Sequence, residues 1–253
     1  MTATQPPRDS ESQTEGGLVL PSYRREQDDV DPPLDYAGYR TTELRHPKNP
    51  LVLLPQALTE LTGPVLGEGR VGPLDHDLTR QHEGEPIGQR IQLSGRVLDS
   101  NGRPVPNALV EVWQANACGR YRHRSDDWPA PLDPNFTGVG RCFTDSDGRY
   151  RFVTVKPGAY PWGNHPNAWR PAHVHFSLFG RAFTQRLVTQ MYFPDDPLFS
   201  EDPIFNSVQD PKARARMVSS FDWDTTEDHW QLGFKWDIVL RGSQGSVFEA
   251  PHT

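Results

Sequence analysis

The stretch WRPAHVHF, residues 169–176, places two histidines two positions apart in an otherwise apolar run. Consecutive residues of a β-strand alternate between its faces, so the rings of His173 and His175 point the same way, within reach of one shared partner. Such a pair is either two hydrogen-bonded buried histidines or two ligands of one metal ion, because imidazole is a common metal ligand. The stretch by itself leaves both interpretations open.

Strand patterns extend outward from this stretch. Residues 172–180 and 185–193 alternate apolar and polar side chains and are predicted to pair with each other. Residues 141–155 are predicted to form a hairpin around the turn Asp145–Gly148. The first strand signal begins at Arg90, after a long irregular stretch.

One segment carries the signals of a helix. In DPKARARMVSSF, residues 210–221, Asp210 can act as the N-cap and Pro211 fits the first helical position. Many short strands with one short helix near 210–221 predict an all-β fold, an antiparallel β-sandwich with long loops.

The N-terminal third differs from the rest of the chain. Residues 1–30 are polar and rich in proline, and they are predicted to be disordered or to form an arm that wraps a partner. Residues 31–88 are predicted to be an irregular region that packs on the core, with one helical turn. The β-sandwich, which would be the catalytic domain, is then expected to occupy residues 89–253.

The composition excludes several classes of protein. A net charge of -7 over 253 residues argues against general binding of nucleic acids. No apolar run reaches membrane-spanning length and no signal-peptide pattern is present, so we expect no membrane association and a cytoplasmic location. Cys118 and Cys142 are the only cysteines. They predict free thiols rather than a disulfide framework, although two cysteines are enough for one disulfide.

Two histidines alone do not hold a catalytic metal, so further ligands have to come from elsewhere in the chain. Two histidines and one carboxylate form a common ferrous site. However, no acidic residue adjoins His173 and His175, and the nearest polar residue upstream is the cation Arg170. A carboxylate site is therefore not favoured.

Tyr121 and Tyr160 are the alternative ligands. A tyrosine in a loop rich in proline and glycine is more often a packing residue than a ligand. A phenolate is nevertheless a hard anionic oxygen donor, and a strongly charged metal can ionise it despite a free pKa of about 10. Two phenolates and two imidazoles would favour Fe(III) over Fe(II), and such an iron suits a catecholate.

Five stretches of the chain resemble the intradiol ring-cleavage dioxygenases, and most of all the iron-binding β subunits of the branch that cleaves protocatechuate. The resemblance runs nearly continuously from about residue 88 to residue 242. The matching stretches are GRVLDSNGRPVPNALVEVWQANACGRYRHR (95–124), APLDPNFTGVGRCFTDSDGRYRFVTVKPGAYPW (130–162), WRPAHVHF, LVTQMYF (187–193) and DIVLRG (237–242).

The resemblance implies a non-haem Fe(III) cofactor and a set of site residues. The four iron ligands would be Tyr121, Tyr160, His173 and His175. Tyr160 would also act in catalysis as the ligand that leaves and accepts a substrate proton, and Arg170 would stabilise charge on the bound substrate. The substrate-binding residues would be Trp162, Gln190, Ile204 and, from the less similar N-terminal part, Tyr39. The chain departs from the family at Cys118, where a glycine is expected, and in its longer N-terminal arm.

The resemblance also implies the reaction and the partner. The substrates would be O2 and a catechol-type aromatic, protocatechuate (3,4-dihydroxybenzoate), cleaved between its two hydroxylated carbons to 3-carboxy-cis,cis-muconate in the β-ketoadipate pathway of aromatic degradation. A homologous α subunit without the iron ligands would complete an α/β hetero-oligomer. The fold would be a transthyretin (prealbumin)-like sandwich.

Two other functions are kept open. One is a catechol or hydroxyquinol 1,2-dioxygenase activity with the same chemistry. Catechol 1,2-dioxygenases carry a helical N-terminal segment, and residues 1–88 show no helical period of that length. The other is a non-catalytic transthyretin-like binding module, which shares the strand and turn pattern but lacks the two histidines and both tyrosines in these contexts.

Overall fold

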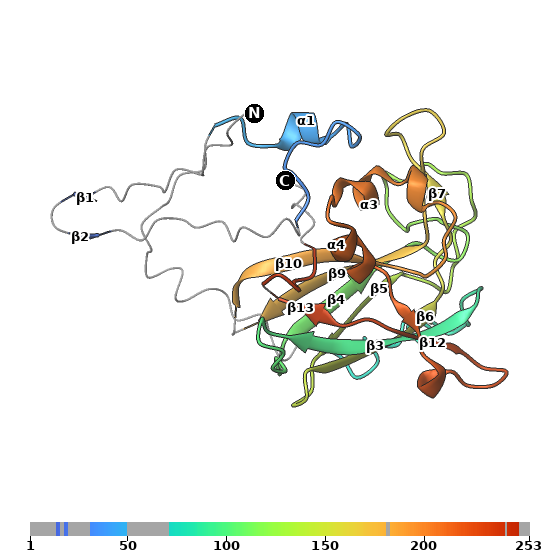
Figure 1. Ribbon diagram of the computed structural model, residues 1–253. Coiled ribbons are helices and arrows are strands. Elements are labelled where there is room, and N and C mark those ends of the chain that lie inside the picture. Colours follow the sequence, from blue (N-terminus) through green and yellow to red (C-terminus); the bar gives the residue numbers. More distant parts are fainter. Residues whose placement is uncertain are drawn as a thin grey trace. The chain divides into compact units, whose positions relative to one another are not determined.

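Two β-sheets face each other across one hydrophobic core (Figure 1). The first sheet is antiparallel throughout, in the order β10 (Phe183–Tyr192), β9 (His173–Gly180), β4 (Leu109–Trp113) and β5 (Val139–Phe143). The second has the order β11 (Ser220–Phe221), β12 (Leu232–Lys235), β3 (Arg90–Leu98) and β13 (Ile238–Val239), and β6 (Arg149–Val155) pairs with β3.

The computed structural model describes residues 14–15, 18–19, 31–49, 71–180, 183–240 and 242–247. Most of the predicted arm, residues 1–30, therefore lies outside the described residues. A two-residue ladder of β1 (Thr14–Glu15) and β2 (Leu18–Val19) belongs to a separate unit of the chain.

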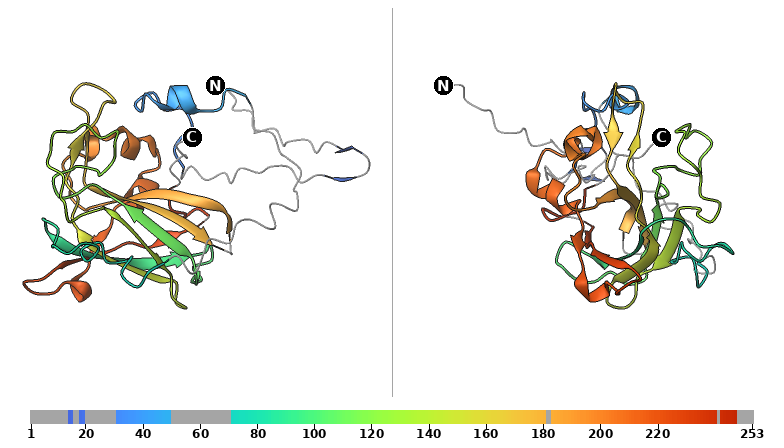
Figure 2. Two further views of the ribbon diagram at one scale, coloured as in Figure 1. Left: turned by 180° about the vertical axis from the view of Figure 1, so that it is seen from behind. Right: turned by 90° about the vertical axis from the view of Figure 1, so that its right-hand side faces the viewer.

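The remaining elements are short. Strands β7 (Tyr160–Pro161) and β8 (Trp169–Arg170) form a small ladder of their own. Among the described residues, the helices are α1 (Thr42–Arg45), α3 (Pro203–Ser207), α4 (Pro211–Arg216) and the 3-10 turns η2 (Phe199–Glu201) and η3 (Trp223–Thr225). Helices α3 and α4 lie over the first sheet on the side away from the second, as Figures 1 and 2 show from opposite directions. No helix among the described residues is long and apolar enough to cross a membrane.

The predicted β-sandwich is confirmed, with three differences. The predicted helix begins where expected, because the Asp210 side chain accepts from the backbone of Lys212 and Ala213, but it ends at Arg216, well before residue 221. Helix α3 was not predicted, whereas α1 lies within residues 31–88, where one helical turn was predicted. The second sheet is mixed, since β12 and β13 both run parallel to β3.

The hairpin predicted for residues 141–155 is wrong. The turn forms as expected, because the backbone nitrogen of Gly148 donates to the Asp145 carbonyl, and the backbone nitrogen of Asp145 donates to the Arg149 carbonyl. However, β5 pairs with β4 in the first sheet and β6 pairs with β3 in the second. The same turn residues serve a hairpin and a crossing between sheets, so local turn chemistry does not tell which sheet the next strand joins.

Strand β9 forms the boundary between the core and the opposite face of the first sheet. Val174, Phe176 and Leu178 are fully buried in the core. The Phe176 ring contacts rings from the second sheet, with centroids 5.6 Å from Tyr150 and 5.0 Å from Trp236. These contacts join the two sheets and leave the alternate residues of β9 pointing to the other face.

A glycine in β3 admits a close approach of the chain beyond β12. The carbonyl of Trp236 lies so near Gly95 that an added Cβ would come within 1.8 Å of its oxygen. The same carbonyl accepts a hydrogen bond from the buried Tyr150 hydroxyl at 2.5 Å. The lack of a side chain at Gly95 thus allows the backbone of Trp236, between β12 and β13, to pack directly against β3.

The two cysteines are not joined. Cys118 is exposed and Cys142 is partly buried against the core, and both are free thiols, as predicted. Burial raises the pKa of Cys142 to about 12, so this thiol stays protonated at neutral pH.

Gly95→Ala is expected to destabilise the fold, because the added methyl group collides with the Trp236 carbonyl rather than with a flexible side chain. Overpacking of this kind costs about 1–3 kcal/mol or more in the free energy of unfolding. Urea denaturation would measure it. Gly163→Ala is the matched control, since nothing lies within 4 Å of the added Cβ there. Equal stability of the two variants would contradict the close approach.

Candidate functional site

The face of β9 turned away from the core carries both histidines of the motif. In the antiparallel ladder His173 lies opposite Tyr192, and His175 lies between Trp113 on β4 and Gln190 on β10. Residues directly opposite on antiparallel strands share a face, so these five side chains gather on one side of the sheet. The rings of Trp113 and His175 are stacked, with centroids 4.7 Å apart.

The His173 ring is oriented by its own backbone. Its Nδ1 lies 2.7 Å from the carbonyl oxygen of Pro171. A carbonyl only accepts, so Nδ1 carries the proton and the Nε2 lone pair faces the opposite way. Metal-binding histidines are typically fixed by such a second contact.

Three polar groups converge on that Nε2 atom. The hydroxyl oxygen of Tyr121 lies 3.4 Å away, that of Tyr160 3.3 Å, and Nη1 of Arg170 3.2 Å. His175 lies beside the same cluster, with its ring 4.9 Å from the ring of His173. The structure therefore brings together all four predicted ligands and the predicted arginine.

The two tyrosines come from different loops. Tyr160 begins β7 and pairs with Arg170 on β8, whereas Tyr121 lies in the long loop after β4. Gly119 lets these loops meet, because its φ of +77° is left-handed and an added Cβ would lie 2.2 Å from the Ala159 carbonyl. The neighbouring Cys118 is exposed, so it does not crowd the Tyr121 loop.

Burial and charge act in opposite directions on Tyr160. Burial raises the pKa of its phenol above the ordinary value, while the nearby Arg170 guanidinium opposes that rise. The phenol is thus protonated near neutral pH, unless a strong positive charge binds beside it.

Arg170 is held in a buried network. Its side chain is 4% exposed, and Asp202, its ion-pair partner, is fully buried. Nη2 donates to Asp202 Oδ2 at 3.0 Å, to the Tyr192 hydroxyl at 2.9 Å and to Gln190 Oε1 at 2.5 Å. Burial disfavours the charge, but Asp202 and the neighbouring tyrosines keep the pKa of Arg170 well above its usual value.

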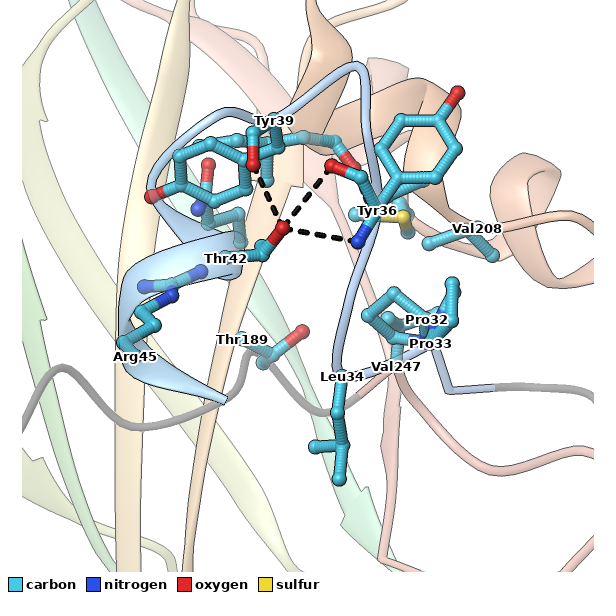
Figure 3. A pocket seen from close by; sticks show the side chains of 14 residues that line it. Pro32, Pro33, Leu34, Tyr36, Tyr39, Thr42, Arg45, Thr189, Val208 and Val247 are labelled. Atoms are coloured by element: carbon cyan, nitrogen blue, oxygen red, sulfur yellow. Dashed lines mark hydrogen bonds between the residues drawn. The ribbon is translucent and has the colours of Figure 1, made fainter. Parts of the chain in front are cut away.

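The predicted substrate-binding residues lie next to this cluster. Tyr39, Gln190 and Ile204 line one pocket, shown in Figure 3. Trp162 adjoins it, because its ring packs edge-on against Tyr39 with centroids 5.5 Å apart, and the Arg170 guanidinium lies 5.7 Å from the Trp162 ring centroid.

The backbone around Tyr39 is held by hydrogen bonds from two side chains, Thr42 and Asn164. The Thr42 hydroxyl lies 2.7 Å from the Tyr39 carbonyl and 2.9 Å from the backbone nitrogen of Tyr36, as Figure 3 shows. Asn164 clamps the same turn, since it accepts from the Arg40 backbone at 3.0 Å and donates to the Gly38 carbonyl at 2.9 Å. The clamp joins this N-terminal turn to the loop that carries Trp162.

Two buried donors beside Arg170 lack a hydrogen-bond partner among the described residues. They are Nε1 of Trp162 and the amide nitrogen Nε2 of Gln190. A buried N–H without a hydrogen-bond partner lowers the stability of the folded state, so such a group commonly binds a ligand or a water molecule. Both side chains flank Arg170, so a polar ligand bound there would meet two ready donors.

The donor set suits a highly charged metal ion. Among the described residues no group of three or more His, Cys, Asp or Glu side chains could hold a metal. Any metal at this cluster would thus need the phenols of Tyr121 and Tyr160 as well as the imidazoles. Two ionised phenols would contribute two negative charges, which match a trivalent ion better than a divalent one.

Sequence reasoning missed two residues of the site, Asp202 and Tyr192. Asp202 carried a signal, because the pattern Asp202–Pro203 repeats the helix start that was recognised at Asp210–Pro211. Tyr192 lies on the predicted strand, but only its register opposite His173 shows that it faces the site.

The chain is similar to known dioxygenases over most of its length. The family described as "Dioxygenase" matches residues 61–242, and the family "Protocatechuate 3,4-dioxygenase beta subunit N terminal" matches residues 23–57. The chain is 57% identical over 216 residues to the protocatechuate 3,4-dioxygenase beta chain of Burkholderia cepacia, which covers 85% of this chain and 92% of that protein.

More distant relatives extend the comparison. The chain is 29% identical over 208 residues to the protocatechuate 3,4-dioxygenase alpha chain of Pseudomonas putida, which covers 79% of this chain and 98% of that one. The crystal structure of 3-chlorocatechol 1,2-dioxygenase from Rhodococcus opacus 1CP has a TM-score of 0.53 at 24% identity, over 70% of this chain and 69% of that chain. This last similarity supports the fold.

Proposed function

This chain belongs to the dioxygenase family, with the protocatechuate 3,4-dioxygenase beta chains, and we propose that it is the iron-binding chain of an enzyme that cleaves protocatechuate. The reaction uses O2, opens the ring between the two hydroxylated carbons and yields 3-carboxy-cis,cis-muconate, in aromatic degradation by the β-ketoadipate pathway. The observation that carries the proposal is the convergence of two phenols and a buried arginine on His173 Nε2.

The alternative substrates have less support. Catechol and hydroxyquinol 1,2-dioxygenases share the catalytic chemistry, but residues 23–57 match the N-terminal family of protocatechuate 3,4-dioxygenase beta subunits. A binding module without catalysis would have no use for a buried arginine directed at His173 beside two tyrosines.

We propose that the cofactor is non-haem Fe(III) and that Tyr121, Tyr160, His173 and His175 are its ligands. The fixed tautomer of His173 supports this assignment, and so does the absence of a carboxylate cluster among the described residues. When bound, a ferric ion supplies Lewis-acid chemistry that draws electron density from a coordinated catechol.

The side chains around the iron would transfer a proton, stabilise charge and orient the substrate. With the metal bound, Tyr160 would be ionised, and its phenolate oxygen would accept a proton from a substrate hydroxyl, so that the substrate binds as an anion. Nη1 of Arg170, on the same side of His173, stabilises negative charge that develops on the ring. Tyr39, Trp162, Gln190 and Ile204 form the walls that orient the ring, and the unpaired Trp162 and Gln190 donors are available to its oxygens.

We also propose an α/β hetero-oligomer, because the chain has relatives among both alpha and beta chains. Exposed aromatic side chains support a protein partner. Trp223 is 79% exposed, Trp230 is 53% exposed, and Phe221 packs edge-on against Trp223. Exposed aromatic side chains of this size are typical of the centres of protein interfaces. The two free thiols fit a reducing compartment, which supports the cytoplasm as the location.

The purified protein is expected to be coloured, because phenolate-to-Fe(III) charge transfer absorbs visible light. Tyr160→Phe should retain iron but bind substrate slowly, since the proton acceptor is lost. Tyr121→Phe should shift the colour further, because the lost ligand is the one that stays bound. Iron analysis and visible spectra measure both effects. Tyr150→Phe, on the core side, is the control that keeps the colour. A colourless, iron-loaded protein would refute the four-ligand assignment.

Arg170→Ala is expected to reduce turnover by roughly 10²–10³-fold, as for other lost donors to a developing negative charge. Iron content should stay unchanged, because Arg170 supplies no ligand. Steady-state kinetics on folded, iron-loaded protein gives the measurement. Arg151→Ala, at an exposed position of β6, serves as the control. Normal turnover of Arg170→Ala would make the arginine a structural residue.

The chain expressed alone is expected to be poorly soluble or poorly active, and co-expression with an alpha-like chain should restore turnover of protocatechuate. Trp223→Ala should weaken the complex without loss of iron, because Trp223 lies outside the donor cluster. Native mass spectrometry and activity assays of both preparations provide the readout. Full activity of a pure homo-oligomer would refute the heteromer and leave the chemistry intact.

A further inference from the structure

We propose that Asp202 is a positioning residue for this reaction, holding one edge of the Arg170 guanidinium so that Nη1 faces the His173 site. The inference rests on the proposed function, because that function gives Arg170 its charge-stabilising role. No hydrogen bond that the structure describes joins Asp202 to the four proposed ligands, although its charge contributes to raising the pKa of Tyr160. Its ion pair and hydrogen bonds at the site are with Arg170, so we place its effect there.

The guanidinium of Arg170 has two sets of contacts. Nε and Nη2 bind Asp202, and Nη1 faces His173. Nε and Nη2 of Arg170 both donate to Oδ2 of Asp202, at 3.4 and 3.0 Å. Nη1, at the other end, lies 3.2 Å from His173 Nε2. A guanidinium is planar and rigid, so fixing one edge also fixes the direction of the remaining nitrogen.

The carboxylate is itself fixed by a helix. While Oδ2 binds Arg170, Oδ1 accepts from the backbone nitrogen of Ile204 at 2.9 Å and caps the N-terminus of α3. The side chain of Asp202 is fully buried. One carboxylate thus couples the orientation of Arg170 to the helix that carries Ile204, a predicted wall of the substrate pocket.

Tyr192 reinforces this arrangement from β10. Its hydroxyl lies 3.0 Å from Asp202 Oδ2 and 2.9 Å from Arg170 Nη2. Its ring lies opposite His173 in the ladder. The strand that pairs with the histidines therefore also braces the ion pair, and the distance between Arg170 and His173 is tied to the register of the sheet.

The chain offers a matched control for Asp202. Asp210 has the same role at α4: it precedes a proline, its side chain caps the helix, and the helix has no contact with Arg170 among those that the structure describes. Asparagine is a good N-cap, so Asp→Asn at either site keeps the cap and removes the charge. Only at position 202 does the change also remove the acceptor for the guanidinium.

Asp202→Asn is expected to reduce kcat about 10- to 100-fold, the usual range for residues that orient a catalytic group. KM and the anaerobic affinity for protocatechuate should change little, because the charge that Arg170 stabilises develops during the reaction. The measurements use folded, iron-loaded protein in its complex with the alpha-like chain. Asp210→Asn should leave kcat and KM unchanged. Tyr192→Phe is a milder second variant in case Asp202→Asn does not fold, and it should lower kcat by a smaller factor.

A double-mutant cycle with Arg170→Ala separates positioning from a general structural effect. If Asp202 acts through Arg170, Asp202→Asn adds almost nothing in the Arg170→Ala background. Unchanged kcat in Asp202→Asn, or effects that multiply independently in the cycle, would overturn the inference. Full turnover of Arg170→Ala alone would instead overturn the proposed role of Arg170, so the two failures are distinguishable.

Discussion

The alternation of strand β9 is the constraint on which the site depends. Phe176 and Val174 are buried in the core, where Phe176 contacts rings of the opposite sheet. Because a slip of one residue would turn these side chains out of the core and the histidines into it, the packing of the sandwich fixes the register. The directions of His173 and His175 are therefore set by hydrophobic contacts on the other side of the same strand.

The loops on that outer face supply the rest of the site, and small local features bring them into place. Gly119 admits the contact between the Tyr121 and Tyr160 loops. Asn164 clamps the N-terminal turn that carries Tyr39. None of these residues has catalytic chemistry, yet each determines whether side chains from separate parts of the chain meet. A site built on loops gains its precision from such anchors to a rigid sheet.

Charge balance gives the buried site its second constraint. A buried arginine is costly unless it is paired and fully hydrogen-bonded. Asp202, Tyr192 and Gln190 meet that requirement on one side of Arg170 and leave Nη1 directed at the proposed ligands. The cation is thus held beside the two phenols, where the proposed reaction would develop charge on the substrate.

The sequence alone determined the strand that carries His173 and His175, their common face, the pairing of β9 with β10 and the start of the helix at Asp210. These follow from periods and caps that act over a few residues. It did not determine that β5 and β6 join different sheets, because the turn between them is compatible with either arrangement. Phenolate chemistry made Tyr121 and Tyr160 ligand candidates and the resemblance assigned them as ligands, but spacing along the chain did not. Tyr121 lies 52 residues from His173, and Arg170 lies 32 residues from Asp202. Only the packing of loops on a sheet of fixed register brings such distant groups together, so tertiary structure decided the donor cluster and the buried ion pair beside it.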